Sequence, residues 1–134
     1  MNFHGDVERL GSVPVADLQA FVAGLDEARW LEDRSRQELF QAHASTSAIK
    51  LIFDADYRHH DPTRHPPYDE MLPLLEPILT LIRAHYSRTL RQRRWIARHG
   101  EGYFVRILLT RLAAGGRIAP HSDGPAADTA DEPA

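Results

Sequence analysis

The sequence predicts an α+β fold, in which two strand-forming stretches build an antiparallel sheet and two amphipathic stretches form flanking helices. In the stretch 48–53, apolar side chains occupy alternate positions, which is the period of a strand. The stretch 103–112 opens with an apolar run rich in aromatic and β-branched residues, which is typical of a buried strand. Near 14–27 and 70–87 the apolar residues recur every three or four positions, which predicts helices.

Composition excludes several classes of protein and of site. The chain has 134 residues, no cysteine and a net charge of −3, so it has no disulfide, no thiolate metal site and no cysteine nucleophile. Residues 1–12 lack the basic and apolar segments of a signal peptide. No apolar run approaches the roughly 18 residues that span a bilayer. We therefore expect a cytoplasmic protein without a membrane partner.

The first predicted helix begins after Pro14 and serves packing, because its apolar residues share one face: Leu18, Phe21, Val22 and Leu25. The mixed, charged segment 30–40 is interpreted as a short strand around Trp30 followed by a loop. Asp69 is suited to cap the second helix. Pro77 is expected to kink that helix or to delay its start, because proline lacks the backbone N–H that a helix interior needs.

The segment 54–68 is predicted to be a loop, and four of its side chains could bind a metal: His59, His60, Asp61 and His65. Neighbouring residues in an extended chain point to opposite sides, so His59 and His60 reach one ion only if the loop turns. We favour a solvated loop. A lid or a substrate-recognition element is the alternative, since long loops often serve such roles.

Residues 88–98 form the one strongly basic stretch, RTLRQRRWIAR, with Trp95 inside it. Basic residues interleaved with an aromatic can bind nucleic acid. The alternative is a charged linker or strand with Trp95 in the core. The net charge of −3 weighs against nucleic acid as a partner.

A candidate metal site follows the second apolar run. Ala113–Gly116 is predicted to turn the chain, because glycine adopts positive φ without steric cost. Residues 117–121 are then predicted to form a short strand that ends in His121-Ser-Asp123. Residues i and i+2 of an extended chain face the same side, so His121 and Asp123 present an imidazole and a carboxylate together. These are two of the three ligands of a facial two-histidine, one-carboxylate iron site.

The stretch 103–124, YFVRILLTRLAAGGRIAPHSDG, resembles the iron-binding region of the aspartyl/asparaginyl β-hydroxylase family. A looser similarity extends back to about Arg36, through RQELFQAHASTSAIKLIF and PYDEMLPLLEPILTLIRAHY. Members of this family are Fe(II)- and 2-oxoglutarate-dependent dioxygenases built on a double-stranded β-helix, the jelly-roll or cupin-like barrel. The resemblance implies hydroxylation of an amino-acid side chain, free or in a peptide, of the aspartyl, asparaginyl or prolyl type.

Under this resemblance His121 and Asp123 are the iron ligands. His43 and Thr46 match a segment near the substrate path, although both could simply end a strand at the surface. Arg117 is close enough in sequence to contact the ligands, although an exposed charge is the default interpretation.

The sequence departs from the family pattern after Asp123. A second histidine and an arginine for 2-oxoglutarate are expected on later strands, but the residues that follow contain neither. We therefore expect a partial jelly roll over 1–124, a disordered acidic tail over 125–134, and doubtful activity. A non-catalytic remnant or binding module is the alternative. Self-association or a partner would complete the sheet, and His43 or His99 could supply the missing imidazole.

Overall fold

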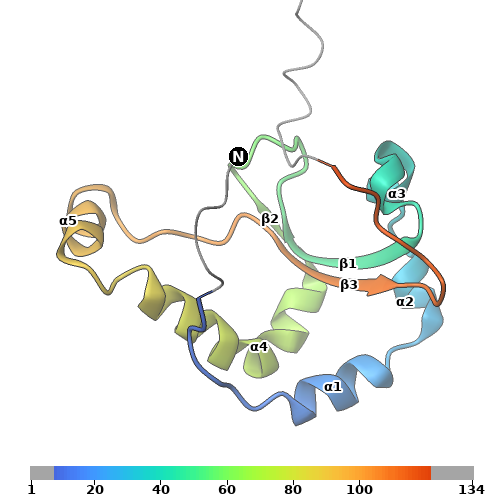
Figure 1. Ribbon diagram of the computed structural model, residues 1–134, viewed down its shortest axis with the longest axis horizontal. Helices are drawn as coiled ribbons and strands as arrows, with labels where there is room; N and C mark the ends of the chain where they lie inside the picture. The colour runs from blue at the N-terminus through green and yellow to red at the C-terminus, as the bar shows by residue number, and fades with distance from the viewer. Residues whose placement is uncertain (1–7, 122–134) are drawn as a thin grey trace, which may run out of the picture. The chain divides into compact units, whose positions relative to one another are not determined.

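A computed structural model describes residues 8–121 of the chain (Figure 1). Within that range, helices alternate with a small antiparallel sheet, which confirms the mixed helix-and-sheet prediction at this level. The elements in chain order are α1 (Ala16–Ala23), α2 (Glu27–Leu31), α3 (Ser35–Leu39), the 3₁₀ turn η1 (Gln41–His43), β1 (Thr46–Phe53), β2 (Thr63–Arg64), α4 (Pro66–His85), α5 (Leu90–His99) and β3 (Ile107–Leu112).

The chain divides into two compact units. One, the sheet unit, comprises Gly24–Met71 and the segment from Tyr103 onward. The other, the helical unit, comprises the segment up to Ala23 and Leu72–Gly102. Helix α4 contributes residues to both units. The predicted domain boundary at residue 124 lies outside the described residues.

Strand β1 is the centre of the sheet unit, with strand order β2-β1-β3 and antiparallel pairing on both sides. Figure 1 shows β1 and β3 side by side, in a register that pairs Thr46 with Leu112 and Lys50 with Leu108. The pairing shifts by one residue between Lys50 and Ile52. The core side chains of β1 are almost fully buried: Ala48, Ile49, Leu51 and Phe53. The strand predicted over 48–53 is confirmed.

The sheet predicted after residue 103 is shorter than expected. β3 begins at Ile107 rather than Tyr103, and residues 117–121 form no strand. Pro120 lacks the N–H that a sheet ladder needs, and no described strand lies beside this segment to pair with it. The turn before it is confirmed, since Gly115 has a φ of +73° and Gly116 N–H donates to the Ala113 carbonyl at 2.9 Å. The described strands do not amount to a jelly roll.

The short strand predicted around Trp30 is wrong, because Trp30 lies in helix α2. The Asp26 side chain accepts a hydrogen bond from Ala28 N–H at 2.9 Å and so caps the first turn. The Trp30 ring is 4% exposed, and the Arg111 guanidinium lies 4.7 Å from its centre. The predicted loop that follows also contains a helix, α3.

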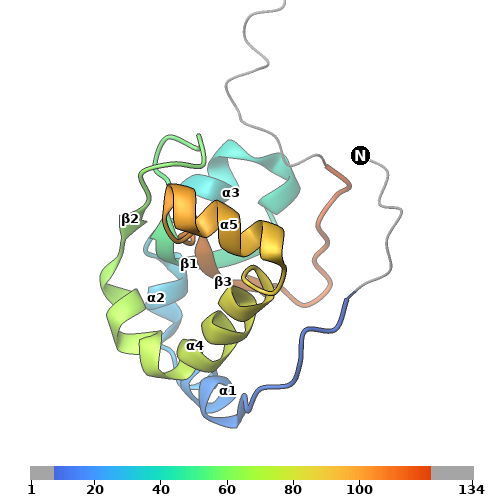
Figure 2. The same cartoon turned by 90° about the vertical axis from the view of Figure 1, so that its left-hand side faces the viewer.

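Helix α1 is shorter than predicted and α4 is longer; Figure 2 labels both helices. Helix α4 begins at Pro66, a position where proline's missing N–H costs nothing, and it continues through Pro73 and Pro77. Pro77 therefore does not delay the start of the helix. Within residues 8–121, no helix combines the length and the apolar character needed to cross a membrane.

Candidate functional site

His43 is held at the start of β1 by buried hydrogen bonds. The Thr46 hydroxyl donates to the His43 carbonyl at 2.8 Å, and the Gln37 amide donates to Thr46 Oγ1 at 3.2 Å. Both Thr46 and Gln37 are buried, and His43 is 8% exposed. Thr46 therefore fixes the backbone that presents His43, which is a structural role for a residue that the resemblance linked to the substrate path.

The His121 ring lies against the His43 ring, with centres 5.1 Å apart and planes at 77°. His121 Nδ1 is 2.8 Å from the Ala119 carbonyl oxygen, which can only accept, so Nδ1 carries the proton. That tautomer puts the lone pair of His121 on Nε2. Metal-binding histidines commonly donate their other ring N–H to a carbonyl in this way.

The distance between the two ring centres fits two imidazoles that share one metal ion. Two imidazoles bound through metal–nitrogen bonds of about 2.1 Å have ring centres roughly 4.5–5.3 Å apart when the bonds meet at about 90–110°. His43 is less ready to bind, because its Nε2 accepts from the Arg36 guanidinium at 3.0 Å. Within residues 8–121, no three His, Cys, Asp or Glu side chains are grouped to hold a metal. Asp123, the predicted carboxylate ligand, lies outside the described residues.

A row of aromatic rings extends from His43 across the sheet unit. The Phe40 ring meets the His43 ring edge-on, with ring centres 6.5 Å apart, and its centre is 5.3 Å from that of Tyr57. The centres of the Tyr57 and Phe53 rings are 5.4 Å apart. Lys50 Nζ lies 4.6 Å from the Phe53 ring centre. Side chains at positions 50 and 53 of a regular strand face opposite sides, so the register shift after Lys50 explains how these two meet.

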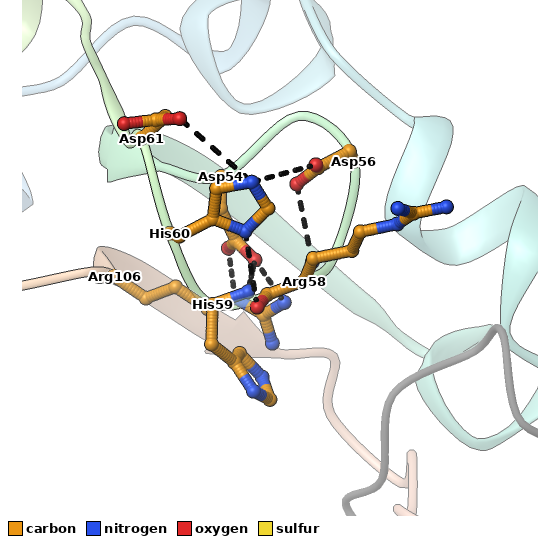
Figure 3. Close-up of polar contacts among 7 residues, drawn as sticks. All are labelled: Asp54, Asp56, Arg58, His59, His60, Asp61 and Arg106. Carbon is orange, nitrogen blue, oxygen red and sulfur yellow. Dashed lines mark hydrogen bonds and ion pairs between the residues drawn. The ribbon is translucent and has the colours of Figure 1, made fainter.

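At the far end of this row, Arg106 binds the fully buried carboxylate of Asp54 (Figure 3). Both Arg106 Nε and Nη2 donate to Asp54, the latter at 2.9 Å, and the His59 backbone N–H donates at 2.7 Å. The Arg106 guanidinium also lies 5.0 Å from the Phe53 ring centre. Hydrogen bonding to Arg106 lowers the pKa of Asp54 to about 2, and it outweighs the opposing effect of burial.

The loop that follows Asp54 adopts an unusual backbone but does not gather its histidines. Tyr57, His59 and Asp61 have φ of 60°, 62° and 45°, a region that non-glycine residues seldom occupy. The His60 ring lies between Asp56 and Asp61, with Nε2–Oδ2 distances of 3.6 and 3.7 Å. Figure 3 shows the His59 side chain pointing away from that of His60. The adjacent histidines therefore point apart although the loop is not extended.

A cleft of about 430 Å³ opens beside β1 in the sheet unit. Four of its charged groups are already paired: Arg29 binds Glu70 through two nitrogens, at 3.1 and 2.8 Å, and Lys50 lies 2.6 Å from Asp33. Burial alone would raise the pKa of Asp33, but the hydrogen bonds from Lys50 and Ser35 lower it to about 2. Because most of its charges satisfy one another, the cleft is a weaker candidate site than the imidazole pair.

Two other predicted residues remain, Arg117 and His99. Arg117 is exposed, in accord with its default interpretation. His99 lies in the helical unit and stacks on Trp95. Sequence reasoning missed Asp54, Lys50 and Arg106, although charged residues at the end of, or inside, apolar strand stretches were a visible signal.

Comparison with known proteins identifies no relative from which a function could be inferred. No protein-family model matches the chain, and no curated protein or solved structure gives a match.

Proposed function

We propose that this chain is a dioxygenase of the aspartyl/asparaginyl β-hydroxylase type, with an Fe(II) site formed by His121, Asp123 and His43. The observation that carries the proposal is the pair of imidazoles 5.1 Å apart, because it brings a second histidine to the His-x-Asp motif. His43 would replace the second histidine that the family pattern expects on a later strand. The sheet would then be part of a jelly roll, and the substrate an amino-acid side chain, free or in a peptide.

Each protein group has a defined task in this site. Iron held here would supply the oxidising chemistry that hydroxylates an unactivated C–H bond, with O₂ as the oxidant and 2-oxoglutarate as the co-substrate that is converted to succinate and CO₂. The Ala119 carbonyl orients His121 by accepting from Nδ1. Thr46 holds the backbone of His43. Phe40 contacts the His43 ring and restricts the approach of water from that side.

Two features predict weak binding by this chain. His43 must give up its hydrogen bond with Arg36 before its Nε2 can bind a metal. Two cations beside the aromatic row, Lys50 and Arg106, are already bound to Asp33 and Asp54. A dicarboxylate co-substrate would have to compete with these carboxylates. We therefore expect low affinity for both iron and 2-oxoglutarate.

The test is Mn(II) binding, measured by electron paramagnetic resonance, in the wild-type chain and in single variants. His121→Ala should abolish binding and His43→Ala should weaken it strongly, because each removes an imidazole ligand. His60→Ala is the matched control and should bind as the wild type does, because His60 contacts loop carboxylates instead. Normal binding by His43→Ala would remove His43 from the site.

Turnover separates the catalytic proposal from the non-catalytic alternative. The Fe(II)-loaded wild type should convert 2-oxoglutarate to succinate, and His121→Ala should not. Metal binding without any succinate would identify the chain as a binding module that has lost the reaction.

A further inference from the structure

Helix α5 presents a strongly basic surface that the proposed iron site does not use. Its ten residues include four arginines and no acidic residue: Leu90, Arg91, Gln92, Arg93, Arg94, Trp95, Ile96, Ala97, Arg98 and His99. The sequence left two interpretations for Trp95, a nucleic-acid contact or a core residue. In the structure, the Trp95 side chain is 65% exposed, so it is not a core residue.

Three of the arginines of α5 and Trp95 gather on one side of the helix. Arg91, Arg94, Trp95 and Arg98 occupy positions i, i+3, i+4 and i+7, which share one face. All four are exposed, whereas the half-buried residues Gln92 and Ile96 lie on another side of the helix. We call the set Arg91, Arg94, Trp95 and Arg98 the α5 face.

The three arginines of this face have no ion pair with any residue in the described range 8–121, unlike Arg88, which binds Glu8 at 2.7 Å. Arg93, on the opposite side, is used within the chain: its Nη1 donates to the Arg88 carbonyl at 2.7 Å. The Trp95 ring packs on His99 at 4.1 Å with a tilt of 34°. A flat ring is thus displayed among three cations.

The helix that carries this face is well fixed at both ends. Thr89 and Gln92 form a reciprocal capping box, with bonds of 2.9 and 3.1 Å. At the other end, Gly100 N–H donates to the Ile96 carbonyl at 2.8 Å. The spacing of the four backbone positions is therefore set before any ligand arrives, which lowers the entropy cost of binding.

We propose that the α5 face binds single-stranded nucleic acid, with a base stacked on Trp95 and phosphates held by Arg91, Arg94 and Arg98. An exposed aromatic ring flanked by cations matches the alternation of base and phosphate in a single strand. Bases in a duplex are stacked on each other and do not offer this contact. The net charge of −3 does not prevent binding, because salt screens charges beyond about 8–10 Å and the local field dominates.

A membrane surface fits this face less well. Helices that lie on membranes insert a continuous apolar side of several large residues. The α5 face has one aromatic ring and no aliphatic side chain, and Ile96 is half-buried elsewhere on the helix. The observations therefore favour a nucleic-acid strand.

The test is fluorescence anisotropy of a labelled oligothymidylate titrated with the full chain at several salt concentrations. Three phosphate contacts predict that the logarithm of the binding constant falls with the logarithm of salt with a slope of about −2. Arg94→Gln should weaken binding severalfold and reduce the slope by about 0.7. The charge-matched control Arg58→Gln, on an exposed loop of the sheet unit, should change neither quantity.

The stacking contact has its own readout. Trp95→Ala should weaken binding about tenfold at an unchanged salt slope, and Trp95→Phe should restore part of the loss. Because Trp30 is buried and Trp95 is exposed, bound oligothymidylate should quench the fluorescence of a Trp30→Phe variant. No binding at low salt would overturn the proposal, and so would equal binding by wild type and Trp95→Ala. Binding to anionic phospholipid vesicles with none to oligothymidylate would also overturn it. None of these measurements depends on a metal ion.

Discussion

Three arginines of the sheet unit and the three arginines of the α5 face have opposite surroundings. Arg29, Arg106 and Arg111 each bind one carboxylate through two nitrogens, with Glu70, Asp54 and Glu27 as partners. The three arginines of the α5 face have no such carboxylate within residues 8–121. The same side chain therefore joins distant segments in one unit and is displayed to solvent in the other.

Burial decides which of the paired arginines stabilises the fold. The Glu27 and Glu70 side chains are 64% and 46% exposed, so water competes for their charges and each pair contributes little. Asp54 is 0% exposed and joins β1 to the segment before β3, 52 residues later. The Asp54–Arg106 pair is therefore where removal of one charge should cost most.

The largest effect is expected for Asp54→Asn. This change should lower the free energy of unfolding by about 2–3 kcal/mol, because Arg106 loses its charged partner in a partly buried place. Urea unfolding measures the loss. Asp56→Asn is the matched control in the same loop, and its exposed carboxylate should cost well under about 1 kcal/mol. Equal losses in the two variants would mean that the Asp54–Arg106 pair contributes no more to the free energy of unfolding than an exposed carboxylate of the loop.

An effect of about 2 kcal/mol is expected from pH at the same pair. The pKa of Asp54 is about 2 in the folded chain and about 3.9 in an unfolded one, so the stabilisation is complete above about pH 5. It should be lost as the pH falls toward 2, because protonation removes the charge that Arg106 binds. The unfolding free energy of the wild type should therefore decline over this range by about 2 kcal/mol more than that of Asp54→Asn. Parallel pH profiles would contradict the assignment.

Periodicity predicted the elements whose side chains divide cleanly between core and solvent. β1 and α4 were found in this way, because buried apolar residues recur along each of them. α2 was missed because five residues are too few to show a period, and a lone Trp30 is compatible with a strand. The start of β3 was placed too early because an apolar composition does not reveal which residues find a pairing partner.

For the candidate site, sequence reasoning found the groups but not their contacts. His121 was marked by its motif and His43 by resemblance, and the structure adds that their rings touch. The Asp54–Arg106 pair could not be found, because a contact between residues 52 positions apart leaves no local pattern. The basic stretch of α5 was noted, but only the fold decides whether Trp95 is buried or displayed.

The smallest effect on stability is expected where the most charge is removed. The triple variant Arg91→Gln, Arg94→Gln, Arg98→Gln should lower the free energy of unfolding by no more than about 0.5 kcal/mol, because glutamine is nearly as good a helix former as arginine. At low salt the free energy of unfolding of the variant should even be slightly higher than that of the wild type. Arg91 and Arg94 are three positions apart and Arg94 and Arg98 four, and each like-charged pair costs about 0.2–0.5 kcal/mol.

That gain should disappear at high salt, where the repulsion is screened. Urea unfolding at two salt concentrations, together with helix content from circular dichroism, tests both parts of the prediction. A loss above about 1 kcal/mol would show that these arginines support the helix, as Arg106 supports the sheet unit, and the contrast between the two groups would fail. If the free energy of unfolding of the variant is unchanged or higher, the charges of the α5 face do not stabilise the fold. Its charge then has to be explained by what it binds.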